Sequence, residues 1–201
     1  MKMLQFSIIV CLAAFASADV IIDEDFEGAV LPVNWQVWQE GDPGATEWEI
    51  CFVGQYTYMP DPAHSGTHYA WHDDDGSDYS DSWIVTDTYD FSSYTEVYSS
   101  FWRYFKYESY YNYSGFWYST DPSPGSSADF IELFELGPVH VDEWWEFATD
   151  ISTECAGQAN VTFAWVYHGY YDHAEAIDDV FIEAISTSLD QNTWGAIKST
   201  F

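Results

Sequence analysis

The feature that most constrains the fold is a series of short apolar or aromatic runs, separated by clusters of glycine, proline, aspartate and serine. Between residues 19 and 185 no stretch has the 3.6-residue apolar period of a convincing amphipathic helix. Runs rich in β-branched and aromatic residues, bounded by turn residues, are typical of strands. Many short strands of this kind predict a β-sandwich or a β-barrel. The expected strands are Val20–Phe26, Trp35–Val37, Glu47–Phe52, His68–Trp71, Ser82–Thr86, Thr95–Tyr107, Tyr113–Ser119, Phe130–Leu136, Glu146–Asp150, Asn160–Tyr167 and Ala176–Glu183.

Two of these runs show how the aromatic residues are distributed. Neighbouring side chains of a strand point to opposite faces. In Asn160–Tyr167, one face therefore carries Val161, Phe163, Trp165 and Tyr167, which predicts a core strand. In Thr95–Tyr107 both faces are apolar or aromatic, so this strand is either covered on both sides or exposes an aromatic strip.

Acidic residues gather at both ends of the domain. Asp178 and Asp179 lie within the last apolar run, and Asp23–Gly28 places acids around Phe26 in the first. Strand alternation predicts the residues that share a face with each aspartate, namely Val180 and Ile182 with Asp178, and Phe181 with Asp179. Adjacent carboxylates beside an apolar strand are costly unless something positive holds them. If the first and last strands pair, both clusters meet, and a hard cation such as calcium would explain them.

The charge of the chain excludes several classes of function. The sequence has 34 acidic residues and 4 basic ones, giving a formal net charge of -30 at pH 7. Such a surface repels nucleic acid and anionic lipid headgroups. Because basic counter-charges are scarce, the charge balance also favours a bound cation at the acid clusters.

The first 18 residues have the pattern of a secretory signal peptide. Lys2 precedes an apolar run that ends at Phe15, and Ala16-Ser17-Ala18 is an A-x-A cleavage site before Asp19. No other run is long and apolar enough to cross a bilayer. We therefore expect an exported protein, secreted or at the cell surface.

Cleavage would remove Cys11 and leave Cys51 and Cys155 in an oxidising compartment. An even number of cysteines there leaves a disulfide open. Whether the two approach closely enough is a matter of tertiary structure.

Several motifs, in order, resemble those of choice-of-anchor J domains, which are related to cleaved adhesin domains and more distantly to MAM domains. The match spans nearly the whole region after the signal peptide, although Asp87 stands where the family usually has proline. The matching segments are Asp25-Phe26-Glu27-Gly28, Pro32-Val33-Asn34-Trp35, Trp48, His64-Ser65-Gly66-Thr67-His68-Tyr69-Ala70, Ser82-Trp83-Ile84-Val85-Thr86, Ser100-Phe101-Trp102, Tyr118-Ser119-Thr120-Asp121, Ala156-Gly157-Gln158 through Tyr167, and Ile177-Asp178-Asp179-Val180.

The resemblance implies an all-β, jelly-roll β-sandwich of two antiparallel sheets over residues 19–185. It also implies a non-catalytic adhesion or recognition module with structural calcium, whose partner is an extracellular glycan or a surface protein. The metal ligands that it implies are Glu27 with Asp178 or Asp179, then Asp25 and Asp81. Backbone carbonyls around Ser65 would complete the shell. The alternative to a bound cation is that Glu27, Asp178 and Asp179 accept hydrogen bonds from the loop backbone and from basic neighbours.

A binding module needs a contact surface, and loops at the ends of sandwiches often supply it. Two tyrosine-rich segments are candidates, with Trp144-Trp145 as a further one and packing between loops as the alternative. Their tyrosines are Tyr110, Tyr111 and Tyr113 in the first segment, and Tyr170 and Tyr171 in the second.

Other chemistries have weaker support. Asp73–Asp78 does not fit an EF-hand, because the first ligand position would fall on Trp71. The four-residue spacing of His64, His68 and His72 suits a zinc site on a helix, but these residues lie in predicted loop and strand. A hydrolase accessory role, or glycan hydrolysis by a surface carboxylate pair, is the alternative class of function.

The composition changes after Ala184. Ile185–Ser188 resembles a polar linker, and residues 186–201 form a C-terminal tail in which Trp194, Ile197 and Phe201 could share one side of a helical turn. The segment Trp194–Lys198 is similar to the ends of other exported bacterial proteins. A sorting or anchoring machinery is therefore an expected partner of the tail.

Overall fold

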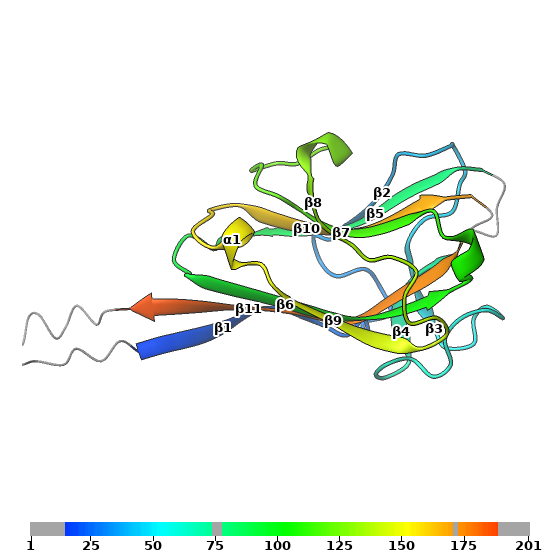
Figure 1. The fold of residues 1–201 in the computed structure, drawn as a ribbon, viewed down its shortest axis with the longest axis horizontal. Coiled ribbons are helices and arrows are strands. Elements are labelled where there is room, and N and C mark those ends of the chain that lie inside the picture. The colour runs from blue at the N-terminus through cyan, green and yellow to red at the C-terminus, as the bar shows by residue number, and fades with distance from the viewer. Residues whose placement is uncertain (1–14, 74–77, 171–172, 189–201) are drawn as a thin grey trace, which may run out of the picture.

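The chain folds into a β-sandwich of two antiparallel sheets. The computed structural model describes residues 15–73, 78–170 and 173–188, and within them it contains eleven strands and three very short helices (Figure 1). All eleven expected strands are confirmed. They are β1 (Phe15–Glu24), β2 (Gln36–Gln39), β3 (Glu49–Phe52), β4 (His68–Asp73), β5 (Ser80–Tyr89), β6 (Glu96–Lys106), β7 (Tyr113–Ser119), β8 (Ile131–Glu135), β9 (Trp144–Asp150), β10 (Val161–Gly169) and β11 (Ala174–Ser188). The helices are η1 (Glu108–Tyr110), η2 (Ser127–Asp129) and α1 (Ser152–Cys155).

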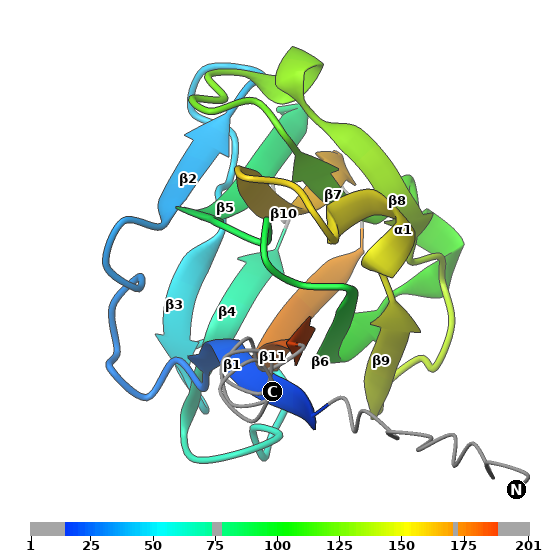
Figure 2. The ribbon, with the colours of Figure 1, turned by 90° about the vertical axis from the view of Figure 1, so that its left-hand side faces the viewer.

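Each sheet is made mostly of neighbouring strands that do not follow one another in the sequence. One has six strands in the order β3-β4-β11-β6-β9, with β1 added beside β11, and the other has five in the order β2-β5-β10-β7-β8. Each sheet thus combines strands that are distant in sequence, and the two sheets lie face to face (Figures 1 and 2). This arrangement is a jelly-roll sandwich.

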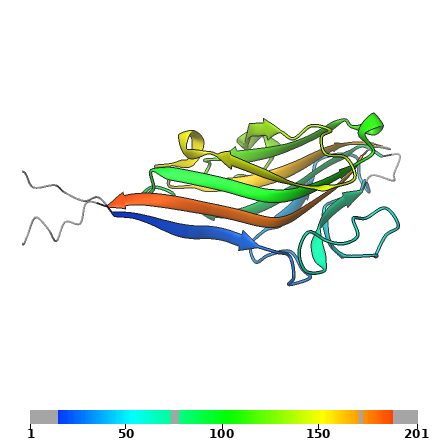
Figure 3. The same ribbon diagram turned by 60° about the horizontal axis from the view of Figure 1, so that its bottom comes forward.

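The first and last strands lie side by side, as expected. β11 pairs with β4 over its first residues and with β1 further on, where Glu24 is opposite Val180 and Asp19 is opposite Ala184 (Figure 3). The pairing brings the end of β1, and the turn that follows it, beside the two aspartates of β11.

The interior is built largely from aromatic rings. The predicted face of β10 is confirmed as core, because Phe163, Trp165 and Tyr167 are each at most 1% exposed. Phe116 of β7 stacks on Trp165 with ring centroids 5.1 Å apart, and Phe101 of β6 meets the same indole edge-on at 5.5 Å. Offset and edge-to-face contacts of this kind add about 0.5–1.5 kcal/mol each beyond area burial.

Loops cover part of the outer face of the six-stranded sheet. Tyr69, Trp71 and Tyr104 are buried there with Met59 and Ala63 of the β3–β4 connection. The strand with two apolar faces, β6, is therefore covered on both sides along part of its length. Trp102, on its outer face, is only partly buried.

The predicted alternation of β11 is wrong beyond Asp178. The register shifts between Asp178 and Phe181, and Asp179 has a positive φ of 47°. A β-bulge of this kind inserts one extra residue. Val180 and Ile182 consequently join the core, while Asp178 lies on the opposite face under the β3–β4 connection.

The ends of the described region differ from expectation at two points. β1 begins at Phe15, inside the expected signal peptide. Ile185–Ser188, expected as a linker, continues β11 and pairs with residues 15–18. The remaining tail and Asp74–Ser77 lie outside the described residues. Within those residues, no helix is long and apolar enough to span a bilayer.

Candidate functional site

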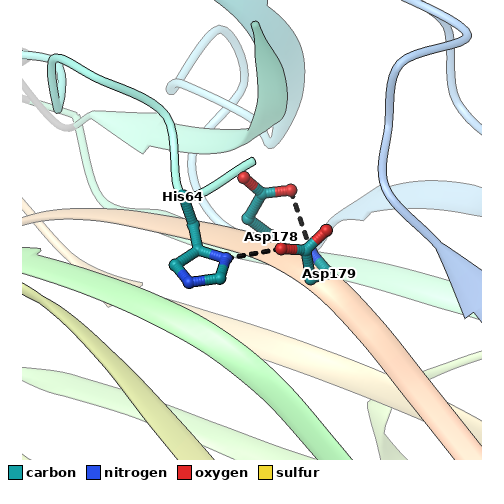
Figure 4. A group of neighbouring side chains, drawn as sticks. All are labelled: His64, Asp178 and Asp179. Atoms are coloured by element: carbon teal, nitrogen blue, oxygen red, sulfur yellow. Dashed lines mark hydrogen bonds and ion pairs between the residues drawn. The ribbon is translucent and has the colours of Figure 1, made fainter. Parts of the chain in front are cut away.

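Three carboxylates, one from near the start of the domain's sequence and two from near its end, accept hydrogen bonds from one short loop. The loop is residues 64–68, at the start of β4, and its partners are Glu27, Asp178 and Asp179. We call this arrangement the loop clamp. Figure 4 shows His64 of the loop pointing at the two aspartates of β11.

Asp178 is the buried member of the clamp, with no solvent exposure. Its Oδ2 accepts a hydrogen bond from the backbone N–H of Ser65 at 3.1 Å, and its Oδ1 accepts one from the N–H of Asp179 at 2.9 Å. Burial raises the pKa of Asp178 to about 7, and the neighbouring charge of Asp179 adds to the rise although these hydrogen bonds oppose it. Ionised Asp178 is therefore an unfavourable charge that a cation would stabilise.

Asp179 contacts the same loop through side chains. Its Oδ1 accepts a hydrogen bond from Ser65 Oγ at 2.7 Å, and its Oδ2 accepts one from His64 Nδ1 at 2.5 Å. The imidazole of His64 stacks on Trp102 of β6, with centroids 3.6 Å apart and planes 12° from parallel. The bulge at Asp179 and the stacked indole together fix the direction of the His64 ring.

Glu27 holds the other side of the loop. Its Oε1 accepts backbone N–H bonds from Thr67 at 2.7 Å and from His68 at 2.6 Å. These bonds lower the pKa of Glu27. Gly66, directly before Thr67, has φ +52°, and a β-carbon added there would collide with the Glu27 carboxylate. A glycine is thus required for the loop to approach this close.

The carboxylate oxygens of the clamp are of the ligand type that calcium takes, and in this structure they accept hydrogen bonds from the loop. Calcium takes six to eight oxygen ligands, mainly carboxylates and carbonyls. Among the described residues, neither Lys nor Arg forms an ion pair with Glu27, Asp178 or Asp179. His64, Asp178 and Asp179 place ligand atoms within 4.8 Å of one another, the one such group of acidic, histidine or cysteine side chains in the described part of the chain. The sequence did not predict His64 as a member, because its spacing from His68 and His72 suits a metal site only on a helix, and these residues lie in loop and strand.

Glu27, the first predicted ligand, is not part of this group, and neither are the weaker candidates Asp25 and Asp81. Asp25 accepts the Glu27 N–H at 3.0 Å and so shapes the turn after β1. Asp81 lies on β5 in the other sheet, 2.9 Å from His168 Nε2 and 2.6 Å from Trp83 Nε1. Burial alone would raise the pKa of Asp81, but these two contacts hold it below its usual value.

The five tyrosines predicted as a contact surface, which we call the tyrosine platform, do not share one environment in the structure. Tyr110 and Tyr170 are 62% and 58% exposed. Tyr111 instead packs against His173, with ring centroids 5.1 Å apart, and Tyr113 donates to Glu132 at 2.5 Å. Tyr171 lies outside the described residues. The packing alternative therefore applies to Tyr111 and Tyr113.

The disulfide left open by the cysteine count is absent. Cys51 and Cys155 are both free and fully buried, Cys51 in the cluster outside the six-stranded sheet and Cys155 in the core between the sheets. The sheet separates the two clusters. Burial raises the pKa of Cys155 to about 12, and it also raises that of Cys51.

The fold and the clamp define a β-sandwich module with its termini paired and one loop held by carboxylates, and solved structures share the sandwich fold. The K1 cleaved adhesin domain of Lys-gingipain from Porphyromonas gingivalis W83 is 15% identical with a TM-score of 0.58, covering 83% of this chain and 97% of that one. The K3 cleaved adhesin domain is 18% identical with a TM-score of 0.57, covering 82% and 98%. The CBM22-1 xylan-binding domain of Paenibacillus barcinonensis Xyn10C is 10% identical with a TM-score of 0.50, covering 86% and 98%. No family model and no curated protein matched the sequence.

Proposed function

We propose that this chain is an exported, non-catalytic adhesion or recognition module for an extracellular glycan or a surface protein, stabilised by calcium at the loop clamp. The likeness to structures described as cleaved adhesin and xylan-binding domains supports the binding role. The signal-peptide pattern of residues 1–18 supports export.

The observation that carries the calcium proposal is the position of Asp178. It is a fully buried carboxylate beside a second carboxylate, and its nearest loop offers hydrogen-bond donors but no Lys or Arg. A divalent cation would reverse this unfavourable balance of charge. Oxygen atoms of Asp178, Asp179 and Glu27 would hold it, and the ion would tie β1, β4 and β11 together.

The same geometry argues against a general-acid role for Asp178. A carboxyl group whose pKa is raised beside a second carboxylate is the arrangement of many acid–base pairs. A general acid must however come within hydrogen-bond reach of its substrate. Asp178 is covered by Ser65 and has no exposed surface, so a substrate atom has no access to it.

Thermal unfolding with and without a chelator tests the calcium proposal. With calcium at 100 times its Kd, binding stabilises the fold by about 2.7 kcal/mol. In a domain of this size, that shifts Tm by roughly 5–10 °C. We expect EDTA to lower Tm by this amount and added calcium to restore it. A Tm that changes with neither EDTA nor calcium would contradict the proposal.

Binding and turnover assays test the functional class. The calcium-loaded protein is presented to immobilised glycans and extracellular-matrix proteins, and is incubated with glycan and ester substrates. We expect retention on a glycan or a protein without turnover. Turnover that a single acid substitution abolishes would instead identify a hydrolase.

A further inference from the structure

A small hollow lies on the outer face of the five-stranded sheet, away from the loop clamp. It has a volume of about 280 Å³, and β2, β5 and β10 form its floor. The turn Pro122-Ser123-Pro124, in the connection between β7 and β8, forms one wall. Ligand sites usually occupy roughly 300–1,000 Å³, so this hollow would take a short segment of a ligand.

The wall of the hollow is fixed by hydrogen bonds at its base. Ser119 Oγ donates to the carbonyl of Asp129 at 2.6 Å, which closes the β7–β8 connection on itself. Ser127 donates to the Glu40 carboxylate through both its N–H, at 2.8 Å, and its Oγ, at 2.6 Å. The connection is therefore tied to the end of β2, and the hollow beneath it is already formed.

Trp38 supplies the aromatic ring of the hollow. Its indole meets Phe130 edge-on, with ring centroids 5.8 Å apart, and its Nε1 donates to Gln36 Oε1 at 3.0 Å. Both contacts fix the ring before a ligand arrives. Pre-organisation of this kind lowers the entropy lost on binding.

The other lining groups are mostly uncharged donors and acceptors. Asn34 Nδ2 donates to Asp87 Oδ2 at 2.9 Å, and the hydroxyls of Thr88 and Thr162 are 2.8 Å apart. Asp87 is the one charged residue of this lining, although the chain has 34 acids. A hollow so depleted of charge does not match a cationic or an anionic ligand, but it matches a neutral one with many hydroxyls.

We infer that this hollow binds a neutral saccharide, with a sugar ring against Trp38 and its hydroxyls bonded to the amide and threonine side chains. This inference rests on the proposed binding function and gives it a ligand class and a site. It differs from the tyrosine platform predicted from the sequence, to which Tyr110 belongs.

Calorimetric titration tests the site with xylohexaose and cellohexaose as neutral probes, and with oligogalacturonate and chitosan oligomers as charged ones. Trp38→Ala removes the ring and should weaken binding at least tenfold. Gln36→Ala removes an exposed amide and should weaken it about two- to tenfold. Ser123→Leu, at an exposed wall position, should obstruct the hollow without touching the core. Tyr58→Ala, at a 43% exposed aromatic residue outside the hollow, is the matched control and should leave affinity unchanged, with Tm reported for every variant.

The outcomes separate the site from the general function. Binding of a neutral probe that weakens in the three hollow variants, but not in Tyr58→Ala, supports the inference. Neutral binding that survives Gln36→Ala and Ser123→Leu, preference for a charged oligomer, or binding of a surface protein alone would overturn the site and leave the proposed function standing. Retention on neither a glycan nor a protein would overturn both.

Discussion

Replacing Asp178 by asparagine should change how stability depends on pH. In the native protein the pKa of Asp178 is raised from its usual 3.8 to about 7 by burial and by Asp179. The folded state therefore holds this proton more tightly than the unfolded state does. Without calcium, the contribution of Asp178 to the free energy of unfolding falls as pH rises from about 4 to 7, and the fall ends above the folded pKa.

The size of the effect follows from the shift. One pKa unit corresponds to about 1.4 kcal/mol, so the full shift amounts to about 4 kcal/mol between pH 4 and pH 8. Asparagine has nearly the same shape and carries no titrating charge. It loses one acceptor facing a backbone N–H, a loss that is the same at every pH.

Urea unfolding of both proteins in EDTA, at several pH values, measures this difference. His72 also titrates, because burial lowers its pKa to about 3, but its effect is common to both proteins and cancels. We expect Asp178→Asn to gain stability over the native protein by up to about 4 kcal/mol as pH rises from 4 to 8. If the free energies of unfolding of the two proteins differed by the same amount at every pH, Asp178 would not be a buried carboxylate without a cationic partner.

Two further substitutions test the packing around the clamp and within the core. Gly66→Ala should destabilise the fold by at least about 1 kcal/mol more than Gly157→Ala in urea unfolding, because both glycines have positive φ but only Gly66 abuts a carboxylate; equal losses would contradict the close approach. Arg103 Nε lies 2.7 Å from the carboxylate of Glu175, which is 1% exposed. Arg103→Met should therefore destabilise the fold by about 3–5 kcal/mol in the same assay, because it leaves the buried Glu175 carboxylate without its arginine partner. Adding Glu175→Gln to Arg103→Met should recover part of that loss, and no recovery would argue against the pair.

The sequence was sufficient to predict the strands, and it raised the pairing of the first and last strands as the condition under which the two acid clusters meet. Turn residues and aromatic runs mark each strand, and the periodicity of β10 alone identified its core face. The acids near Glu27 and at Asp178 were notable because so few bases accompany them.

The details of the clamp could not be predicted in the same way. The bulge at Asp179 depends on a positive φ in a non-glycine residue, which neighbouring contacts impose and strand periodicity does not reveal. His64 joins the clamp through a tertiary contact with Trp102. The separation of Cys51 from Cys155 by a whole sheet is likewise a property of the three-dimensional fold.

Direct calcium titration of protein stripped with EDTA tests the central claim, that one ion joins the two ends of the domain at the loop clamp. We expect saturable binding of one calcium per chain, which is weakened at least tenfold in Glu27→Gln and Asp178→Asn. Glu47→Gln, the same charge change at an exposed site before β3, should bind as the native protein does. Absence of calcium binding, or binding that all three variants retain equally, would contradict the claim.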